Sequence, residues 1–249
     1  MRKPFQGTLN ILRFNWHFYL LALIGLGFLL SIESLIPDPL NLLIWIGSFI
    51  TIADIIVSLA VSFYIYDLSG LYAFKWIKAI GDEKLIVNIH AGFDESSVGL
   101  KQLFKSAELT VFDFYNPKIH TEVSIKRARK AYPPFTGTIA IETKSIPLAN
   151  ESADKIFVIF SAHEIRDEQE RVAFFKELNR CLKPKGEIIV VEHLRDTLNF
   201  MAYSIGFFHF YSLKTWLRVF KTAELTLNKT QKLTPFVSVY TLHSNGNQL

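Results

Sequence analysis

The sequence predicts an α/β domain with a mostly parallel sheet and an antiparallel edge strand, preceded by a hairpin of two transmembrane helices. Two long apolar runs near the N-terminus and a mean hydropathy of +0.24, high for a soluble α/β protein, predict the hairpin. After residue 66, short apolar runs alternate with amphipathic runs, which is typical of strands covered by helices on both faces. We therefore expect a membrane anchor at residues 1–66 and a globular domain at residues 67–249.

The apolar runs extend over residues 14–36 and 40–66, and each exceeds the roughly 20 residues that span a bilayer. Two prolines in the connector, residues 37–39, end the first helix and turn the chain. Basic residues flank both outer ends and none lies in the connector, so the positive-inside rule places both termini and the domain in the cytoplasm, anchored to the inner, cytoplasmic membrane. A cleaved signal peptide is the alternative, which the second apolar run disfavours.

Composition narrows the class of protein further. The net charge of +4 is spread along the chain, which disfavours nucleic acid as a partner. Cys181 is the only cysteine, so a disulfide framework and a thiolate metal site are excluded. Asp54 lies near the middle of the second apolar run, where a carboxylate is costly, so it is a candidate functional group. The alternative, which we favour, is a structural role as a neutral carboxyl that bonds to a neighbouring hydroxyl or contacts another subunit.

The domain is predicted to begin with a short helix capped by Asp67 and ending at Gly81. Strands are then predicted at residues 85–89, 109–112, 138–141, 154–160, 187–192, 225–232 and 236–242, and helices at residues 96–105, 117–132, 167–182 and 212–223. The last two strands face each other across Thr234-Pro235, which predicts an antiparallel pair at one edge of the sheet.

Ligands of such sheets bind beyond the carboxyl ends of the strands. The polar candidates at those ends are His90, Asp94, Glu95, Asp113, Glu142, Ser161, His163, Glu164, Glu192 and His193. Asp113 follows Gly92 by 21 residues, the spacing at which dinucleotide-type folds place an acid for ribose hydroxyls. The alternative for Asp113 is a cap of the next helix.

The segment Ile146–His193 carries the most specific pattern: a proline-leucine pair, a polar turn, a strand that begins at an aspartate, a helix and a Lys-Pro-Lys-Gly turn into another strand. With it, residues 85–242 resemble class I S-adenosylmethionine-dependent methyltransferases, particularly those of quinone rings and small lipids. The resemblance implies a Rossmann-like methyltransferase sheet with S-adenosylmethionine as cofactor. It also implies that Asp113 holds the ribose, that Glu142 binds the adenine amino group, and that residues 161–163 border the methyl end.

The first motif of that family is substituted here. Asn88 replaces its acid, and His90 and Asp94 replace two of its three glycines, so that only Gly92 remains. Glycine serves there because it adopts positive φ and lets the backbone approach the cofactor. Asp94 or Glu95 would replace the lost acid and bind the methionine amino group.

Methyl transfer depends mostly on positioning and desolvation, and needs a base only when the acceptor loses a proton. His163, Glu164 and His193 are the groups best placed for this. Their structural alternatives are a helix start at Glu164 and a helix cap at His193. A metal site of these three is possible in composition, but no ligand spacing in the sequence supports one.

The stretch 198–211 is strongly apolar and aromatic, and lies where this family often builds its acceptor site. It predicts either a membrane-facing lid over a hydrophobic acceptor or a packing surface for the hairpin or a second copy of the chain. The predicted function is methylation of a lipid-soluble acceptor: a quinone, polyprenyl, aryl compound or lipid headgroup. The alternative is an inactive methyltransferase-like scaffold at the membrane.

Overall fold

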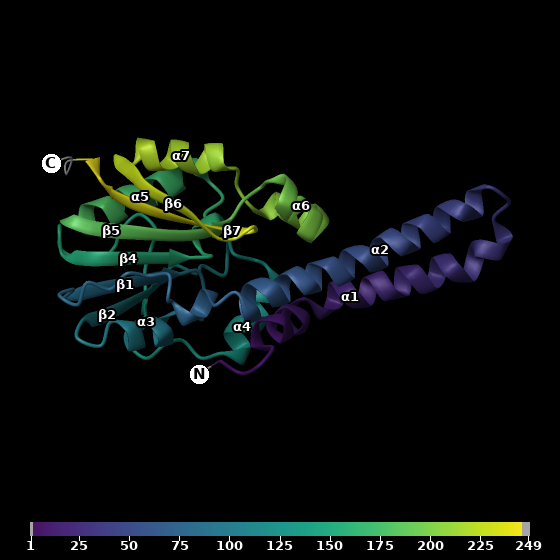
Figure 1. Ribbon diagram of the computed structural model, residues 1–249, viewed down its shortest axis with the longest axis horizontal. Coiled ribbons are helices and arrows are strands. Elements are labelled where there is room, and N and C mark those ends of the chain that lie inside the picture. The colour runs from purple at the N-terminus through teal and green to yellow at the C-terminus, as the bar shows by residue number, and fades with distance from the viewer. Residues whose placement is uncertain (1, 246–249) are drawn as a thin grey trace.

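The computed structural model describes residues 2–245, which form a seven-stranded sheet with a helical hairpin projecting from one end (Figure 1). The strand order is β3-β2-β1-β4-β5-β7-β6. The first five strands in this order are parallel, and β7 runs antiparallel between β5 and β6. The predicted fold class, including the antiparallel edge pair, is confirmed. The strands are β1 Leu85–His90, β2 Glu108–Asp113, β3 Ile139–Ala140, β4 Ala153–Ile159, β5 Leu182–His193, β6 Leu225–Thr234 and β7 Val237–Ser244.

Helices cover both faces of this sheet. The α-helices of the domain are α3 Ser97–Leu103, α4 Val123–Ala131, α5 Glu168–Cys181, α6 Thr197–Tyr203 and α7 Leu213–Thr222. One face packs against α5 and α7, whose Phe174, Phe175 and Trp216 are fully buried. The other packs against α3 and the segment that follows the hairpin, where Ile65 and Phe74 are buried. The continuous apolar strands predicted from the sequence are therefore buried on both sides, as parallel strands require.

The predicted helix between Asp67 and Gly81 is wrong. Within residues 69–80, all of which the structure describes, only the single turn Leu71–Ala73 is helical. Gly70 and Phe74 flank that turn in the left-handed region, at φ 75° and 54°, and an α-helix cannot continue through such residues. Burial of Phe74 in the core outweighs the local helical pattern.

Two element boundaries also differ from the prediction. The basic helix begins at Val123 rather than at Pro117. The fifth strand begins at Leu182 rather than at residue 187. Leu182 pairs with Ala153, and the Lys-Pro-Lys-Gly segment belongs to the strand instead of forming the predicted turn before it.

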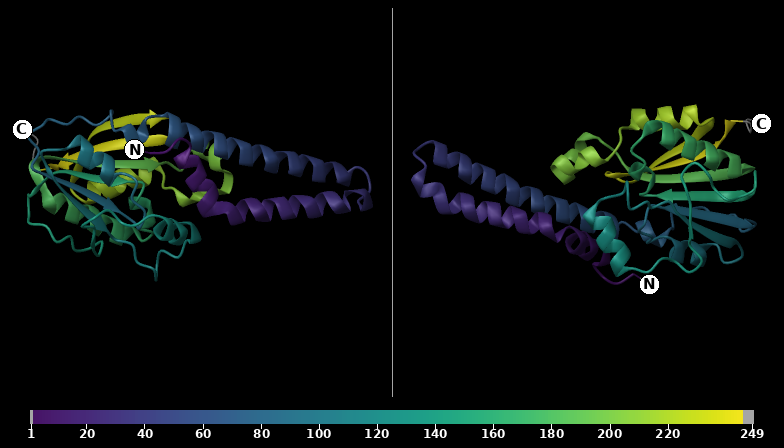
Figure 2. Two further views of the ribbon diagram at one scale, coloured as in Figure 1. Left: turned by 90° about the horizontal axis from the view of Figure 1, so that it is seen from below. Right: turned by 180° about the vertical axis from the view of Figure 1, so that it is seen from behind.

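The hairpin consists of α1 Gln6–Ile32, extended by one turn to Leu35, and α2 Leu40–Phe63, extended by a π-helical turn Tyr64–Leu68. Both helices are long and apolar enough to cross a membrane, which by itself is weak evidence for membrane association. Most of their length projects from the domain as a pair (Figure 2). Large apolar side chains are exposed on its outer surface, among them Phe18, Leu23, Phe28, Phe49 and Ile56.

The base of the hairpin rests on the carboxyl edge of the sheet. Asn10 of α1 donates to Glu95 in the loop after β1 (3.2 Å) and accepts a hydrogen bond from Tyr132 after α4 (2.8 Å). Tyr66 meets His193 at the end of β5 (2.9 Å). The predicted ligand-binding edge therefore lies directly beneath the apolar helices, with α4 and α6 on either side of the base (Figure 1).

Candidate functional site

The turn after β1 is held together by its own polar side chains. Asn88 donates to the hydroxyls of Ser96 and Ser97 at 2.9 and 2.8 Å. Asp94 accepts the backbone N–H groups of the same two serines at 2.9 and 3.0 Å, just before α3. The two residues that replace the family's acid and last glycine are thus used to fix the turn.

Gly92 is the one glycine of the first motif that remains, and the structure requires it. Its φ is 92°, and a Cβ there would lie 2.9 Å from the ring of Tyr115. Arg129 lies over that ring, with 4.4 Å between guanidinium and centroid, and donates to the Gly92 carbonyl at 3.3 Å. Tyr115 and Arg129 therefore fill the space beside the glycine.

Asp113 ends β2 next to His90 at the end of β1, as the prediction of a ribose-binding acid requires. Its carboxylate forms an ion pair with Arg129 and accepts the Tyr115 N–H at 2.9 Å. His90 Nδ1 lies 3.7 Å from the same carboxylate, and burial lowers the pKa of His90 although Asp94 and Asp113 oppose this. Asp113 therefore lies where a ribose-binding acid is expected, but its carboxylate is already paired with Arg129.

Glu95 has a comparable partner. It accepts hydrogen bonds from Arg2 (2.8 Å), Asn10 (3.2 Å) and Tyr72 (3.1 Å). Burial raises the pKa of Glu95, and the charge of Arg2 only partly offsets this. The guanidinium of Arg2 thus neutralises the carboxylate that we predicted would bind the methionine amino group.

The cavity at this edge has a volume of about 140 Å³, below the ~300 Å³ at which small-molecule sites usually begin. It is lined by Tyr72, Ala91, Phe93, Glu95, Ser96, Ile125, Ile159, Phe160 and Glu164. Arg2 and Arg129, whose side chains are 23% and 38% exposed, have room to leave their carboxylates. A cofactor would enter only after such a movement.

Two further predicted cofactor residues lie at the same edge. Ser161 is buried after β4 and donates to the carbonyl of Ile89 at 2.9 Å, which joins the ends of β4 and β1. Glu142 is exposed, one residue after Ile141, whose N–H donates to the Asp113 carbonyl at 3.0 Å. The roles of both residues stay predictions.

His163 and Glu164 form a buried charged cluster with Glu192. His163 Nδ1 lies 2.7 Å from Glu192, and its Nε2 lies 3.3 Å from Glu164. Burial disfavours the charged imidazole, but Glu192 and Glu164 outweigh it and raise the pKa of His163 to about 10. Burial likewise opposes ionisation of Glu164, yet hydrogen bonds from His163 and His209 lower its pKa. At neutral pH the imidazole is protonated and Glu164 is ionised.

His209 completes this cluster and is not among the residues that the sequence singles out. It ends the short helix Ser204–His209, with Nε2 at 3.3 Å from Glu164 and Nδ1 at 3.2 Å from Glu122. The signal for it was a histidine within the aromatic stretch 198–211, which the sequence predicted to be an acceptor lid or packing surface.

His193, the third predicted catalytic residue, makes its hydrogen bonds outside the cluster of His163 and Glu164. Its ring is stacked between Phe160 and Phe210, with centroids 5.0 and 4.8 Å away. Its nitrogens contact the Tyr66 hydroxyl at 2.9 Å and the Phe236 carbonyl at 3.1 Å. Burial, with the nearby charge of His163, lowers the pKa of His193 to about 4. A neutral histidine joins the hairpin to the sheet here, and Asp196 rather than His193 caps α6.

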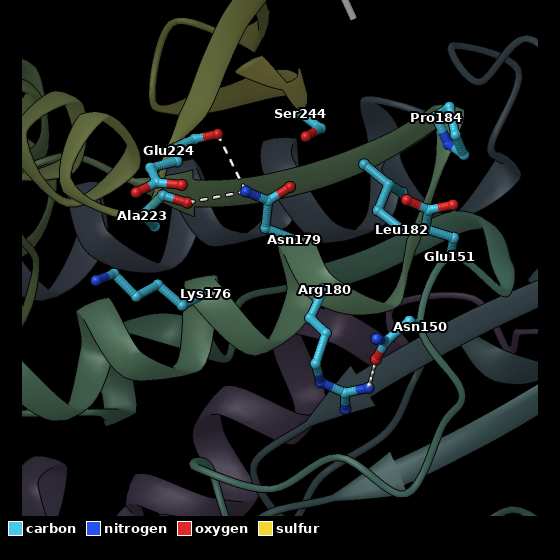
Figure 3. Close-up of a pocket in the computed structure, with 10 residues that line it drawn as sticks. All are labelled: Asn150, Glu151, Lys176, Asn179, Arg180, Leu182, Pro184, Ala223, Glu224 and Ser244. Carbon is cyan, nitrogen blue, oxygen red and sulfur yellow. Dashed lines mark hydrogen bonds between the residues drawn. The ribbon is translucent and has the colours of Figure 1, made fainter. Parts of the chain in front are cut away.

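A larger cavity, of about 520 Å³, lies at the amino ends of β4 and β5 (Figure 3). Two of its polar side chains already donate hydrogen bonds: Asn179 to the carbonyls of Ala223 and Glu224 at 3.1 Å, and Arg180 to Asn150 at 2.8 Å. Because ligands of parallel sheets bind at the carboxyl ends, this cavity is not the candidate site.

Comparisons with known proteins agree with the fold. Residues 92–190, from the turn at Gly92 into β5, match the family described as a methyltransferase domain. The chain matches no curated protein. Together with the sheet, the family match supports a class I methyltransferase and S-adenosylmethionine as its cofactor.

Three solved structures are similar to this chain in fold. A complex of a Haloferax volcanii methyltransferase with a methyltransferase activator has a TM-score of 0.53 at 11% identity, over 77% of this chain and 97% of that one. The cyclase SpnF has a TM-score of 0.50 at 11% identity, over 71% and 79%. An S-adenosylmethionine-dependent methyltransferase from Aquifex aeolicus has a TM-score of 0.49 at 16% identity, over 64% and 82%.

Proposed function

We propose that this chain is a membrane-anchored, S-adenosylmethionine-dependent methyltransferase that acts on a lipid-soluble acceptor. One observation carries the proposal: the base of the apolar hairpin rests on the carboxyl edge of the sheet, through the contacts of Asn10 with Glu95 and of Tyr66 with His193. A methyltransferase sheet binds its cofactor at that edge. An acceptor dissolved in a bilayer around the hairpin would therefore lie next to the cofactor.

The residues at the edge fit the cofactor once Arg2 and Arg129 release their carboxylates. Asp113 would then accept hydrogen bonds from the ribose hydroxyls, and Glu95 would bind the methionine ammonium. The buried Nε2 of His90 has no hydrogen-bond partner among residues 2–245 and offers one more polar contact. When bound, S-adenosylmethionine supplies an electrophilic methyl group.

The residues of the chain would contribute mainly positioning and a proton acceptor. Glu164 lines the cavity and is ionised, so it can take the proton of a hydroxyl acceptor. His163 cannot do so at neutral pH, because it is already protonated. Phe93 and Phe160, also in the cavity wall, exclude water from the reacting atoms.

The acceptor class follows from the surface beside this edge. Helix α6 packs against α2, and the surface that α6 and the short helix Ser204–His209 present carries the exposed side chains Phe200, Met201, Ile205 and Phe208. Apolar side chains of this kind suit a membrane interface and the hydrophobic part of a quinone, polyprenyl, aryl compound or lipid.

The hairpin itself supports anchoring. Its most apolar windows are almost entirely exposed, 0% and 6% buried, whereas the core helix of a soluble protein would be mostly buried. The basic residues lie at its domain end, with Arg2 and Lys3 before α1 and Lys75 after α2. By the positive-inside rule both termini and the domain face the cytoplasm.

Calorimetric titration of S-adenosylmethionine and S-adenosylhomocysteine into the full chain in detergent tests the cofactor site. We expect binding of one equivalent, lost in Asp113→Asn and retained in Asp82→Asn, which alters an exposed acid elsewhere. Absence of binding at millimolar cofactor would end the enzyme proposal.

Acceptor class is tested separately, by following labelled methyl groups from the cofactor into lipid extracts or quinones within vesicles. Label recovered only in water-soluble acceptors would overturn the lipid part of the proposal.

An inactive scaffold at the membrane is the second candidate. The ion pairs Arg129–Asp113 and Arg2–Glu95 and the small cavity favour it, because they close the cofactor site. The likeness to a cyclase also shows that this fold serves reactions other than methyl transfer. The same titration separates the two candidates, since a scaffold would bind neither ligand.

A further inference from the structure

We propose that His163, Glu164 and His209 form a binding site for a divalent transition-metal ion of the zinc class. Each offers one ligand atom, and these atoms all lie within 4.8 Å of one another. Glu164 and His163 follow β4, whereas His209 comes from the loop region after β5. Two imidazoles and one carboxylate are a common protein ligand set for zinc and its neighbours.

The separations suit a single ion. Glu164 Oε1 lies 3.3 Å from Nε2 of His163 and 3.3 Å from Nε2 of His209. Bonds of about 2.0 Å in a tetrahedron hold neighbouring ligand atoms about 3.3 Å apart. The two imidazole rings are nearly perpendicular, at 75°, with centroids 4.9 Å apart. Both separations that include the carboxylate therefore match a tetrahedral site.

Outer carboxylates orient both imidazoles. Nδ1 of His163 lies 2.7 Å from the fully buried Glu192, and Nδ1 of His209 lies 3.2 Å from Glu122. Metal-binding histidines usually donate their second ring N–H to such a partner, which leaves the other nitrogen free for the ion. Here both Nε2 atoms face Glu164, and an ion would displace the proton between His163 and Glu164 and the contact of Arg166 with Nε2 of His209 (2.9 Å).

The net charge of the cluster also favours a divalent cation. Glu122, Glu164 and Glu192 carry three negative charges, and Arg166 adds one positive charge beside Glu122 at 3.8 Å. With neutral imidazoles the cluster keeps two negative charges, which one divalent ion neutralises. Arg166 contacts the ring of His209 and would have to move from it, as its 44% exposed side chain allows, while its bond to the His209 carbonyl (2.7 Å) can remain.

Three protein ligands leave a fourth position open, as in catalytic rather than structural zinc sites. Glu164 also lines the cavity at the cofactor edge, so the ion would lie at the acceptor side of that cavity. With Glu164 bound to the ion, a Lewis acid there would polarise an oxygen of the acceptor and favour its deprotonation, in place of direct proton transfer to Glu164. This role rests on the proposed function, whereas binding of the ion does not.

The test uses the full chain in detergent, stripped with a chelator and titrated with Zn²⁺ in competition with a chromophoric chelator. We expect one equivalent to bind, with affinity reduced by about 10- to 100-fold in Glu192→Gln, the typical effect of losing an outer partner. His209→Gln removes a ligand and should weaken binding more. His243→Gln, which changes a histidine bonded to the Gly186 carbonyl outside the cluster, should match the wild type.

Cobalt substitution keeps the test independent of how the variants fold. Co²⁺ bound by the wild type should give the visible absorption bands of a four-coordinate nitrogen and oxygen site. No stoichiometric binding by the wild type, or equal affinities in His209→Gln and His243→Gln, would overturn the proposal. Metal binding without cofactor binding would leave it standing and reject only the proposed function.

Discussion

At the scale of single residues, two of the carboxylates expected to bind the cofactor are paired with arginines. Arg129 reaches Asp113 from α4, and Arg2 reaches Glu95 from the start of the chain. Each pair substitutes a guanidinium for the hydroxyls or ammonium of the ligand. Cofactor binding therefore competes with internal ion pairs, and the competition can be altered by mutation.

Arg129→Gln should increase affinity for S-adenosylmethionine. The substitution frees Asp113 and leaves a shorter side chain over Tyr115. The pair is partly exposed, so we expect a modest gain, about tenfold or ~1.4 kcal/mol. Calorimetric titration measures it, with Lys130→Gln on the same helix as the control. Weaker binding in Arg129→Gln would mean that Arg129 itself contacts the cofactor.

Buried His193 should make stability depend on pH in the acidic range. Its folded-state pKa of about 4 lies below the unfolded value of about 6.5, so the unfolded chain binds the proton first. Stability is then complete above pH ~6.5 and falls by up to about 3 kcal/mol as the pH approaches 4. Thermal unfolding midpoints from pH 7 to 4.5 should fall faster in the wild type than in His193→Gln. Parallel curves would contradict the assignment.

At the scale of elements, Asp67 shows where local pattern and tertiary structure diverge. It was expected to cap the helix that follows it, but it caps α1 instead, accepting the N–H groups of Gly7 and Thr8 at 2.8 and 2.9 Å. A carboxylate at a helix N-terminus also interacts favourably with the helix dipole. The end of the hairpin is thereby tied to its own beginning.

Asp67→Asn should destabilise the base of the hairpin by about 1–2 kcal/mol, because the amide replaces one of two acceptor oxygens with a donor. The unfolding midpoint in detergent should fall, while Asp82→Asn should leave it unchanged. Equal midpoints in the two variants would show that this cap contributes nothing to the fold.

Met201 of α6 is 66% exposed on the apolar surface beside α2. Met201→Asp should impair methylation of acceptors held in vesicles and leave cofactor affinity unchanged, since a charge is costly at the interface. Leu217→Asp, an exposed apolar position on α7, is the matched control. Equal losses in both variants would argue against a specific acceptor surface.

All seven strands overlap the predicted ones, and the central strands β1, β4 and β5 were predictable because each contains a short apolar run. The absence of a helix after Asp67 could not be predicted, because tertiary packing fixes Gly70 and Phe74 in the left-handed region and the local sequence pattern does not show this. Asp113 could be placed from its spacing to Gly92. His209 could not, because its partners Glu122 and Glu164 approach it only in the folded chain. For the same reason neither arginine pair could be foreseen.

At the scale of the whole molecule, the hairpin and the sheet are joined through the site rather than through a separate linker. We expect the full chain to stay with membranes washed at high pH, as a spanning protein does. In sealed vesicles, protease should digest the domain only when the cytoplasmic face is outward. Release by washing, or digestion from the opposite face, would reject the anchored orientation.

The contacts of Asn10 and Tyr66 at the foot of the hairpin have a consequence for selectivity. In the proposed membrane-anchored enzyme they would hold the reacting edge at a constant height above the lipid surface, so the distance of an acceptor's reactive atom from that surface would matter as well as the acceptor's shape. A molecule whose reactive atom lies deep among the acyl chains would not be methylated, even if its shape fits the site. Acceptors would arrive by diffusion in two dimensions and the cofactor from the water. A series of lipids with spacers of graded length should show one optimum.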